Sequence, residues 1–265
     1  MTSPAAQAAE IIKSRNITGV ETALILSRSM AAAAEIVEDP TGIPYADLPG
    51  FPGAVVKGGE VQICSIEGVK ILLLKGRPDF HETGDPSLLF SAIETLSLLG
   101  VRNVLAAGFA TSVNAQMSPS SLVAIADHID FKGLNPLIGA PGDRKLLNMN
   151  EVYDKRLLRR LRASAASAGV GLQEGVYLWH SGPSFETPAE AKLARLLGAD
   201  VMGMALASEA ILARRFNLPY AAVVVVTDFA AGFQGGAPVG DLSRGPTVAG
   251  VIALRRLLRA YPRFR

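Results

Sequence analysis

Residues 220–227 read YAAVVVVT, and this run decides the fold class. Valine is β-branched, and an unbroken apolar run of this length is typical of a strand buried on both faces of a sheet. Shorter apolar runs bounded by turn residues predict further strands at residues 22–26, 61–66, 69–74, 103–107, 122–126 and 176–179. The run at 61–66 is separated from the next by Glu67 and Gly68, and we expect these two runs to form a hairpin.

Helical patterns alternate with these strands. They predict helical segments at residues 30–36, 87–99, 150–168, 187–197, 207–216 and 247–260. Thr187 is followed by Pro188, and Glu190 stands three residues after the threonine, which predicts a capping box at a helix start. The alternation predicts an α/β fold: a single domain over residues 1–265, with a mixed, mostly parallel twisted sheet flanked by helices.

Composition excludes several classes of protein. Of the 265 residues, 49% are hydrophobic and 19% are charged, which excludes a disordered chain. The sequence shows neither a signal peptide nor an apolar run long enough to span a bilayer, so we expect no membrane association. Cys64 is the only cysteine, which is compatible with a cytoplasmic protein. The three histidines are far apart in sequence, so we expect no metal site.

The net charge is +2, too small to predict nucleic-acid binding. Positive charge is nevertheless concentrated in two segments, residues 155–162 and 255–265. Solvated faces of two amphipathic helices explain both clusters, and a phosphate-rich partner is the alternative interpretation.

The loops that follow strands are the expected binding region, because ligands of such folds bind at the carboxyl ends of the strands. Arg28 follows the first strand at the start of a helical stretch and could bind an anion, although Ser27 beside it could simply cap that helix. Arg77 and His81 share the next such loop. An arginine can clamp phosphate and a histidine can add a hydrogen bond, but ordinary surface ion pairs would give the same pattern.

The segment at 181–190 carries the densest signal. Phe185 could stack on a planar heterocycle, and Glu186 could accept a hydrogen bond from a ring N–H. The alternative is that Phe185 belongs to the core and that Glu186 interacts with the dipole of the helix that follows.

Residues 182–204, GPSFETPAEAKLARLLGADVMGM, closely resemble the signature of the trimeric purine nucleoside phosphorylases. The resemblance continues, in order, over about residues 20–235. It includes the segments VLAAG at 104–108, DHIDFKGLNPLIG at 127–139, LQEGVYL at 172–178 and SEAILARRFNLPYAAVVVVTD at 208–228.

This resemblance implies purine salvage by a pentosyltransferase. A purine ribonucleoside and phosphate would give free purine and ribose 1-phosphate, with phosphate as co-substrate, no cofactor and a homotrimeric assembly. Two alternatives remain open. The chain could bind a purine or nucleoside without turnover, or it could use an altered substrate, such as a 6-aminopurine nucleoside or methylthioadenosine, or water as the acceptor.

The resemblance also assigns roles to residues of the base and ribose site. Glu186 corresponds to the glutamate that accepts from purine N1–H, and Phe185 to the stacking aromatic residue. Met204 and Ala107 correspond to contacts with the substrate.

The phosphate site implied by the resemblance holds Arg77 and Ala106. His81 is the counterpart of the phosphate-loop histidine, although Asp79 could occupy that position instead. Arg28 stands at the serine position of the family's Gly-Ser-Gly phosphate loop and would bind phosphate by charge.

Several positions depart from the family pattern. Ala205 replaces a second phosphate-binding serine, Ala54 replaces a histidine near the phosphate, and Phe109 replaces a glycine. Asp228 replaces the asparagine that discriminates between bases. An ionised aspartate only accepts hydrogen bonds, which suits a 6-amino group or a protonated N7, whereas Glu186 suits a 6-oxopurine. Asp228 could act as a general acid on the leaving purine, or it could cap the turn after the strand.

Overall fold

The structure is a computed structural model that describes residues 2–15, 17, 19–78, 80–140, 146–233 and 245–264. For Arg28 and Ser29 it describes the backbone alone.

The described strands form one mixed sheet in the order β2-β3-β4-β1-β5-β8-β7-β6-β9. Their bounds are β1 Thr22–Ser27, β2 Glu38–Pro44, β3 Glu60–Ile66, β4 Val69–Arg77, β5 Asn103–Ser112, β6 Leu122–Asp130, β7 Leu172–Trp179, β8 Val201–Gly203 and β9 Tyr220–Phe229. β9 also pairs with β5, so the second half of the sheet closes into a ring. β1 pairs in parallel with β4 and with β5. β5 also pairs in parallel with β9, and β7 pairs in parallel with β6 and with β8.

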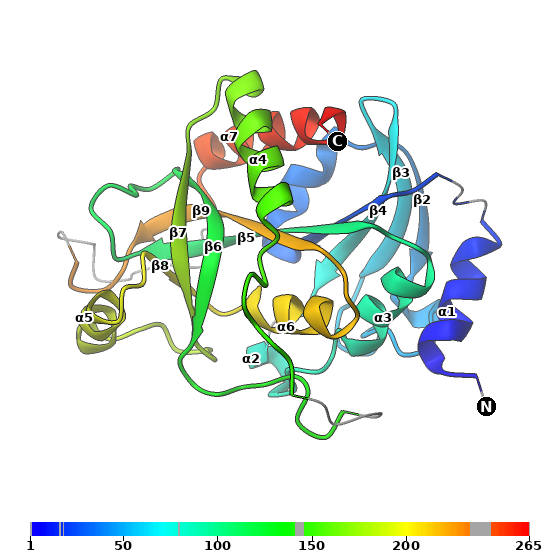
Figure 1. Cartoon of the computed structure of the whole chain (residues 1–265), viewed down its shortest axis with the longest axis horizontal. Helices are drawn as coiled ribbons and strands as arrows, with labels where there is room; N and C mark the ends of the chain where they lie inside the picture. Colours follow the sequence, from blue (N-terminus) through cyan, green and yellow to red (C-terminus); the bar gives the residue numbers. More distant parts are fainter. Residues whose placement is uncertain are drawn as a thin grey trace.

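Helices pack around this sheet in two groups (Figure 1). α1 (Pro4–Lys13), α3 (Phe90–Leu98) and α6 (Ala207–Arg215) form one group, in which α3 contacts both of the others. α4 (Lys155–Ala168), α7 (Val248–Ala260) and the 3-10 helix η1 (Arg28–Ile36) form the other, in which α7 contacts both of the others. Short helical segments η2 (Tyr45–Asp47), α2 (Phe80–Thr83) and η4 (Tyr261–Arg263), and the helix α5 (Pro188–Leu196), complete the described helical structure. The predicted α/β class with a mixed sheet flanked by helices is confirmed.

The valine run from which the fold class was predicted forms the central strand of the hydrophobic core. The side chains of Tyr220–Val226 are fully buried in β9, which lies between β5 and β6. A strand that is covered on both faces needs apolar residues at every position, and this explains why the run does not alternate. The predicted hairpin is also present, as β3 and β4 pair antiparallel through Ile66 and Val69.

Some elements differ from their predicted bounds. α4 begins at Lys155 rather than at residue 150, because the Asp154 side chain caps it by accepting from the backbone N–H groups of Arg156 and Leu157. The stretch at 30–36 belongs to a 3-10 helix. β2 was not predicted, since it is an exposed edge strand that contains two prolines and shows no buried pattern.

The predicted capping box at the start of α5 is confirmed. The Thr187 Oγ1 accepts from the Glu190 N–H at 3.2 Å, and the Glu190 Oε2 accepts from the Thr187 N–H at 2.8 Å. The box fixes the point at which the segment before α5 enters the helix, and that segment carries Phe185 and Glu186.

Because a lost N-cap costs about 1 kcal/mol, we expect Thr187→Ala to lower the free energy of unfolding by about that amount in urea denaturation. Thr187→Ser keeps the hydroxyl, so its free energy of unfolding should fall by only a few tenths of a kcal/mol. Equal losses in the two variants would contradict a role for the cap.

Of the helices that the structure describes, none combines the length and apolar character needed to cross a membrane.

Candidate active site

A cleft of about 330 Å³ opens at the carboxyl ends of β4, β5 and β9. Its walls come from segments far apart in sequence: the end of β4 with α2, the end of β5, the segment before α5, and the chain from β8 to α6. The lining residues are Arg77, His81, Phe109, Ala110, Thr111, Pro183, Phe185, Glu186, Met202, Gly203, Met204, Ala205 and Thr227. This is the position at which open α/β sheets bind their ligands.

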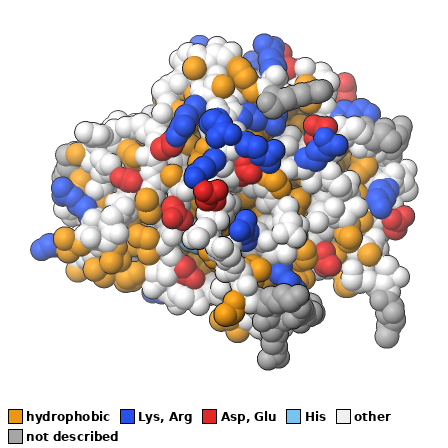
Figure 2. Space-filling model, in the orientation of Figure 1, with side chains coloured by type: hydrophobic (Ala, Val, Ile, Leu, Met, Phe, Trp, Pro, Cys, Tyr) orange, Lys and Arg blue, Asp and Glu red, His pale blue; other side chains and the backbone are white. Residues whose placement is uncertain are grey.

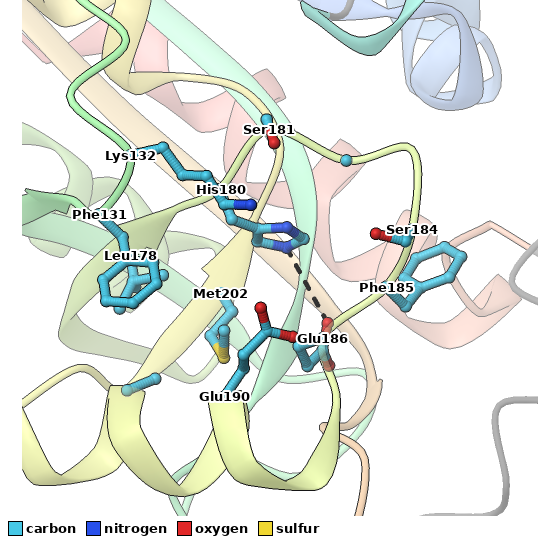
Figure 3. A pocket seen from close by; sticks show the side chains of 12 residues that line it. Phe131, Lys132, Leu178, His180, Ser181, Ser184, Phe185, Glu186, Glu190 and Met202 are labelled. Atoms are coloured by element: carbon cyan, nitrogen blue, oxygen red, sulfur yellow. Dashed lines mark ion pairs between the residues drawn. The ribbon is translucent and has the colours of Figure 1, made fainter.

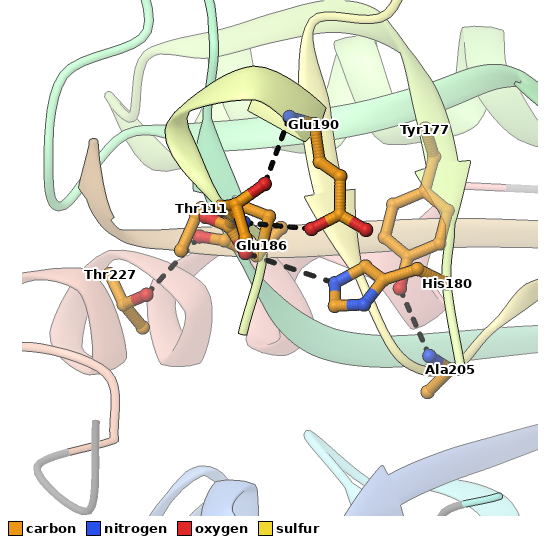
Figure 4. Close-up of polar contacts among 9 residues, drawn as sticks. Thr111, Tyr177, His180, Glu186, Glu190, Ala205 and Thr227 are labelled. Atoms are coloured by element: carbon orange, nitrogen blue, oxygen red, sulfur yellow. Dashed lines mark hydrogen bonds and ion pairs between the residues drawn. The ribbon is translucent and has the colours of Figure 1, made fainter. Parts of the chain in front are cut away.

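Glu186 is the buried acid of this cleft, with 6% of its surface exposed. The Thr111 hydroxyl donates to its Oε1 at 2.9 Å, and its Oε2 lies 3.9 Å from the Nε2 of His180 (Figure 4). Burial raises the pKa of the Glu186 carboxyl, while hydrogen bonds from Thr111 and from backbone groups oppose this shift. A partly desolvated carboxylate in a cleft is suited to bind a ring N–H by a charge-assisted hydrogen bond.

Two spaces meet at Glu186. Phe185 is 37% exposed and lines the cleft, so the aromatic ring is available to a ligand rather than buried in the core. Phe185 and Glu186 also line an adjoining small cavity of about 20 Å³, together with residues such as Lys132, His180 and Glu190 (Figure 3). Burial lowers the pKa of His180, so that its imidazole is neutral at neutral pH.

At the floor of the cleft, the segment that contains Gly182 packs closely against the segment that contains Met204. Gly182 adopts φ +62°, and a Cβ at this position would collide with the Sδ of Met204. Only glycine lets the two segments meet here. The Ala205 N–H donates to the Tyr177 hydroxyl at 3.1 Å, and Leu206, the next residue, adopts φ +70°. A non-glycine residue in this region is strained, and such strain is concentrated at functional sites.

Arg77 provides positive charge in the same cleft, but it is already paired with Glu209. Its Nε lies 3.2 Å from the Oε1 of Glu209, and the two side chains are 3% and 0% exposed. Glu209 also accepts a hydrogen bond from the Tyr220 hydroxyl at 3.0 Å. The ion pair holds the Arg77 guanidinium at the cleft wall, and it offsets part of the charge that an anion would meet there.

The structure brings together five of the predicted site residues: Arg77, His81, Phe185, Glu186 and Met204 all line the cleft. Of the two residues that compete for the phosphate-loop position, His81 lines the cleft and Asp79 lies outside the described residues. The Arg28 backbone begins η1, and its side chain also lies outside what the structure describes.

Three predicted residues do not line the cleft. Ala106 and Ala107 are fully buried inside β5, where they pair with β1 and β9. Their expected position at a strand end has to be corrected, because β5 continues to Ser112 and presents residues 109–111 to the cleft instead. Asp228 follows the lining residue Thr227, and its Oδ1 accepts from the backbone N–H of Phe229 at 2.8 Å. That bond fits the alternative in which Asp228 caps the turn.

Sequence reasoning missed Thr111, His180 and Glu209. A longer prediction for β5 would have placed Thr111 near its carboxyl end. His180 directly follows the predicted end of β7 at Trp179, and its place at a strand end was the signal that could have identified it. Glu209 lies in a helix one turn after the Met204 segment, and no local pattern marks it as the partner of Arg77.

The described residues contain no cluster of three or more His, Cys, Asp or Glu side chains that could hold a metal ion. The chemical groups that the cleft presents are a buried carboxyl, a guanidinium, an imidazole and an aromatic ring.

Comparison with known proteins agrees with this geometry. The family model of the phosphorylase superfamily matches residues 22–255. Purine nucleoside phosphorylase 1 of Geobacillus stearothermophilus is 33% identical over 232 residues, which cover 85% of this chain and 84% of that protein. Purine nucleoside phosphorylase 1 of Bacillus subtilis is 32% identical over 231 residues, covering 85% of each chain.

Among solved structures, a Schistosoma purine nucleoside phosphorylase in complex with guanosine superposes with a TM-score of 0.80 and 26% identity, over 97% of this chain and 94% of that one. The chain thus belongs to the phosphorylase superfamily and, within it, to the purine nucleoside phosphorylases, a family of pentosyltransferases.

Proposed function

We propose that this protein catalyses the phosphorolysis of purine ribonucleosides to free purine and ribose 1-phosphate, and that it does so in purine salvage. The observation that carries the proposal is the buried Glu186 carboxyl, which accepts a hydrogen bond from Thr111 in a cleft that Arg77 and His81 also line. An acid that can bind the base and an arginine that can bind an anion thus share one cleft, as a nucleoside with phosphate beneath its sugar would require.

Each group has a role in this reaction. Glu186 accepts from purine N1–H, and Phe185 stacks on the base. Arg77, His81 and Arg28 bind phosphate, and Met204 contacts the ribose and base. Asp228, which follows the lining residue Thr227, would have to release the Phe229 N–H that its Oδ1 caps before it assists the departure of the purine. The glycosidic bond breaks through an oxocarbenium-like state, so holding phosphate and stabilising charge on the leaving purine supply the catalysis. Phosphate is the co-substrate, and the reaction needs neither a metal nor an organic cofactor.

The proposal is tested by offering inosine, guanosine, adenosine and methylthioadenosine to the purified protein, each with and without phosphate. Release of free base that depends on phosphate is the expected result. Absence of release together with purine binding in calorimetry would support a protein that binds without turnover.

A second candidate, hydrolysis with water as the acceptor, is favoured by one observation. The wall that would hold phosphate has alanine rather than a hydroxyl donor at position 205, and Glu209 already offsets part of the charge of Arg77. Release of base at the same rate with and without phosphate would establish this candidate.

The pH dependence tests the base site separately. Glu186 must be ionised to accept from N1–H, and burial raises its pKa. We therefore expect kcat/KM for inosine to fall on acidification at a pH above the ordinary titration range of a glutamate, measured between about pH 5 and about pH 8. A profile without this acid limb, or the same limb in a Glu186→Gln variant, would contradict the assignment.

We also propose that the chain forms one domain and assembles as a homotrimer in the cytoplasm. One continuous sheet supports the single domain. Exposed apolar side chains of α5 and its C-cap, Leu193, Leu196 and Leu197, support burial against another copy. The sole thiol, Cys64, is free and buried, which fits a reducing compartment.

A further inference from the structure

A second large concavity lies at the opposite end of the parallel strands from the cleft. It has a volume of about 1270 Å³ and is lined by the first residues of β1, β4 and β5, namely Thr22, Val69 and Asn103. α4 and the residues that follow α7 complete its walls. We refer to this concavity as the basic groove.

The basic groove is strongly cationic. Its positively charged lining residues come from β4, the loop before β5, α4 and the C-terminal segment: Lys70, Arg102, Arg156, Arg159, Arg160 and Arg263. One acidic residue, Glu21, lines it. Figure 2 shows Lys and Arg side chains gathered on the face that carries α4. The basic segment at 155–162 thus meets Arg263, from the second basic segment of the sequence, at one site.

Neighbouring acids neutralise only part of this charge. Arg102 pairs with Glu21 at 3.3 Å, Arg156 with Asp154 at 3.3 Å, and Arg263 with Glu67 at 2.6 Å. Among the described residues, Lys70, Arg159 and Arg160 form no ion pair, although Glu21 lies near enough to Arg160 to interact with its charge. A groove that only stabilised the fold would be expected to pair its cations more fully, because like charges repel in a shared concavity.

Arg160 is held in place before any ligand arrives. Its Nε donates to the backbone carbonyl of Tyr261 at 2.9 Å, and its Cζ lies 4.1 Å from the centre of the Tyr261 ring. No described residue accepts a hydrogen bond from its two terminal nitrogens. A guanidinium fixed in this way loses little conformational freedom on binding an anion, and its fork matches phosphate oxygens.

We propose that the basic groove binds a compact polyphosphate anion, such as the phosphate chain of a nucleoside triphosphate. Guanidinium groups from three directions around a concavity suit several consecutive phosphates, and Phe264 at the same groove offers an apolar surface. A compact ligand is favoured over nucleic acid because the positive charge is local, and the net charge of +2 provides little attraction along an extended strand. This site is separate from the cleft and does not depend on its activity.

The test is calorimetric titration with ATP and with inorganic tripolyphosphate, both free of magnesium and at low salt. The variant Lys70→Gln/Arg156→Gln/Arg159→Gln removes three exposed cations of the basic groove. The matched control Lys13→Gln/Lys57→Gln/Lys192→Gln removes three exposed cations elsewhere. We expect the groove variant to weaken binding about tenfold or more, and the control to bind as the wild type does. Binding of both probes indicates recognition of the phosphate chain, and binding of ATP alone indicates that the nucleoside contributes.

Thermal melting verifies that both triple variants are folded. The single variant Arg159→Glu changes one residue and reverses its charge, and it should also weaken binding. Binding that survives undiminished in the groove variants belongs to the active-site cleft and would overturn the proposal. Absence of binding by both probes in the wild type would also overturn it, as would tighter binding of a single-stranded oligonucleotide than of ATP.

Discussion

Replacing Glu186 with glutamine is expected to lower kcat/KM for inosine by about 100-fold and, at the same time, to raise the midpoint of thermal unfolding. The loss of activity follows because a charge-assisted hydrogen bond to purine N1–H is replaced by a neutral contact with an amide. The amide can instead donate to N1 of a 6-aminopurine, so the ratio of activity on adenosine to activity on inosine should increase.

The gain in stability has a separate cause. The pKa of Glu186 is higher in the folded protein than in the unfolded chain. Its contribution to stability is therefore present at low pH and is lost as pH rises through the folded pKa, where a charged group must remain buried. Glutamine carries no charge and can still accept from Thr111, so the variant avoids this cost at neutral pH. The difference in melting temperature between the two proteins should shrink on acidification.

Glu190→Gln is the matched control, since it makes the same chemical change four residues along the chain. The Glu190 carboxylate belongs to the capping box, and hydrogen bonds from Thr187 lower its pKa. This variant should melt at a lower temperature and keep its activity on inosine. If Glu186→Gln behaved in the same way as Glu190→Gln, the base site would have been assigned to the wrong residue.

The fold could be predicted from sequence wherever burial was complete. The valine run of β9 and the hairpin of β3 and β4 carry strong local patterns, because side chains that are buried in the core must be apolar. β2 carries no such pattern, since Ile43 is its only buried residue and the strand is otherwise an exposed edge held by backbone pairing. The end of β5 was also misplaced, because Gly108 and the polar Thr111 and Ser112 interrupt the hydrophobic signal, although these residues continue the ladder.

The site could be predicted where one loop carries several functional residues. Phe185 and Glu186 are adjacent and precede a capped helix, so their position at the cleft followed from the local sequence. The pairing of Arg77 with Glu209 could not be predicted, because 132 positions separate the two residues and only the packing of α6 against the sheet brings them together. The local sequence indicates that Arg77 can bind an anion, whereas the tertiary contacts determine that Glu209 is its ion-pair partner.

Arg77→Met is expected to lower the free energy of unfolding by about 3–5 kcal/mol and to abolish saturation by phosphate. The substitution removes the guanidinium from a fully buried carboxylate, and an ionised group left without its partner in the interior is strongly destabilising. Urea denaturation measures the first effect, and initial rates over a range of phosphate concentrations measure the second.

The double variant Arg77→Met/Glu209→Gln separates the two effects. It removes both charges while glutamine can still accept from the Tyr220 hydroxyl, so most of the lost stability should return, whereas phosphate saturation should not. The single variant Glu209→Gln tests the same residue in the opposite way, because it removes the internal counter-ion of Arg77. Added phosphate should therefore stabilise this variant against unfolding more than it stabilises the wild type. If Arg77→Met retained wild-type stability, the buried pair would not hold the cleft wall. If phosphate stabilised Glu209→Gln no more than the wild type, Arg77 would not be the residue that phosphate meets.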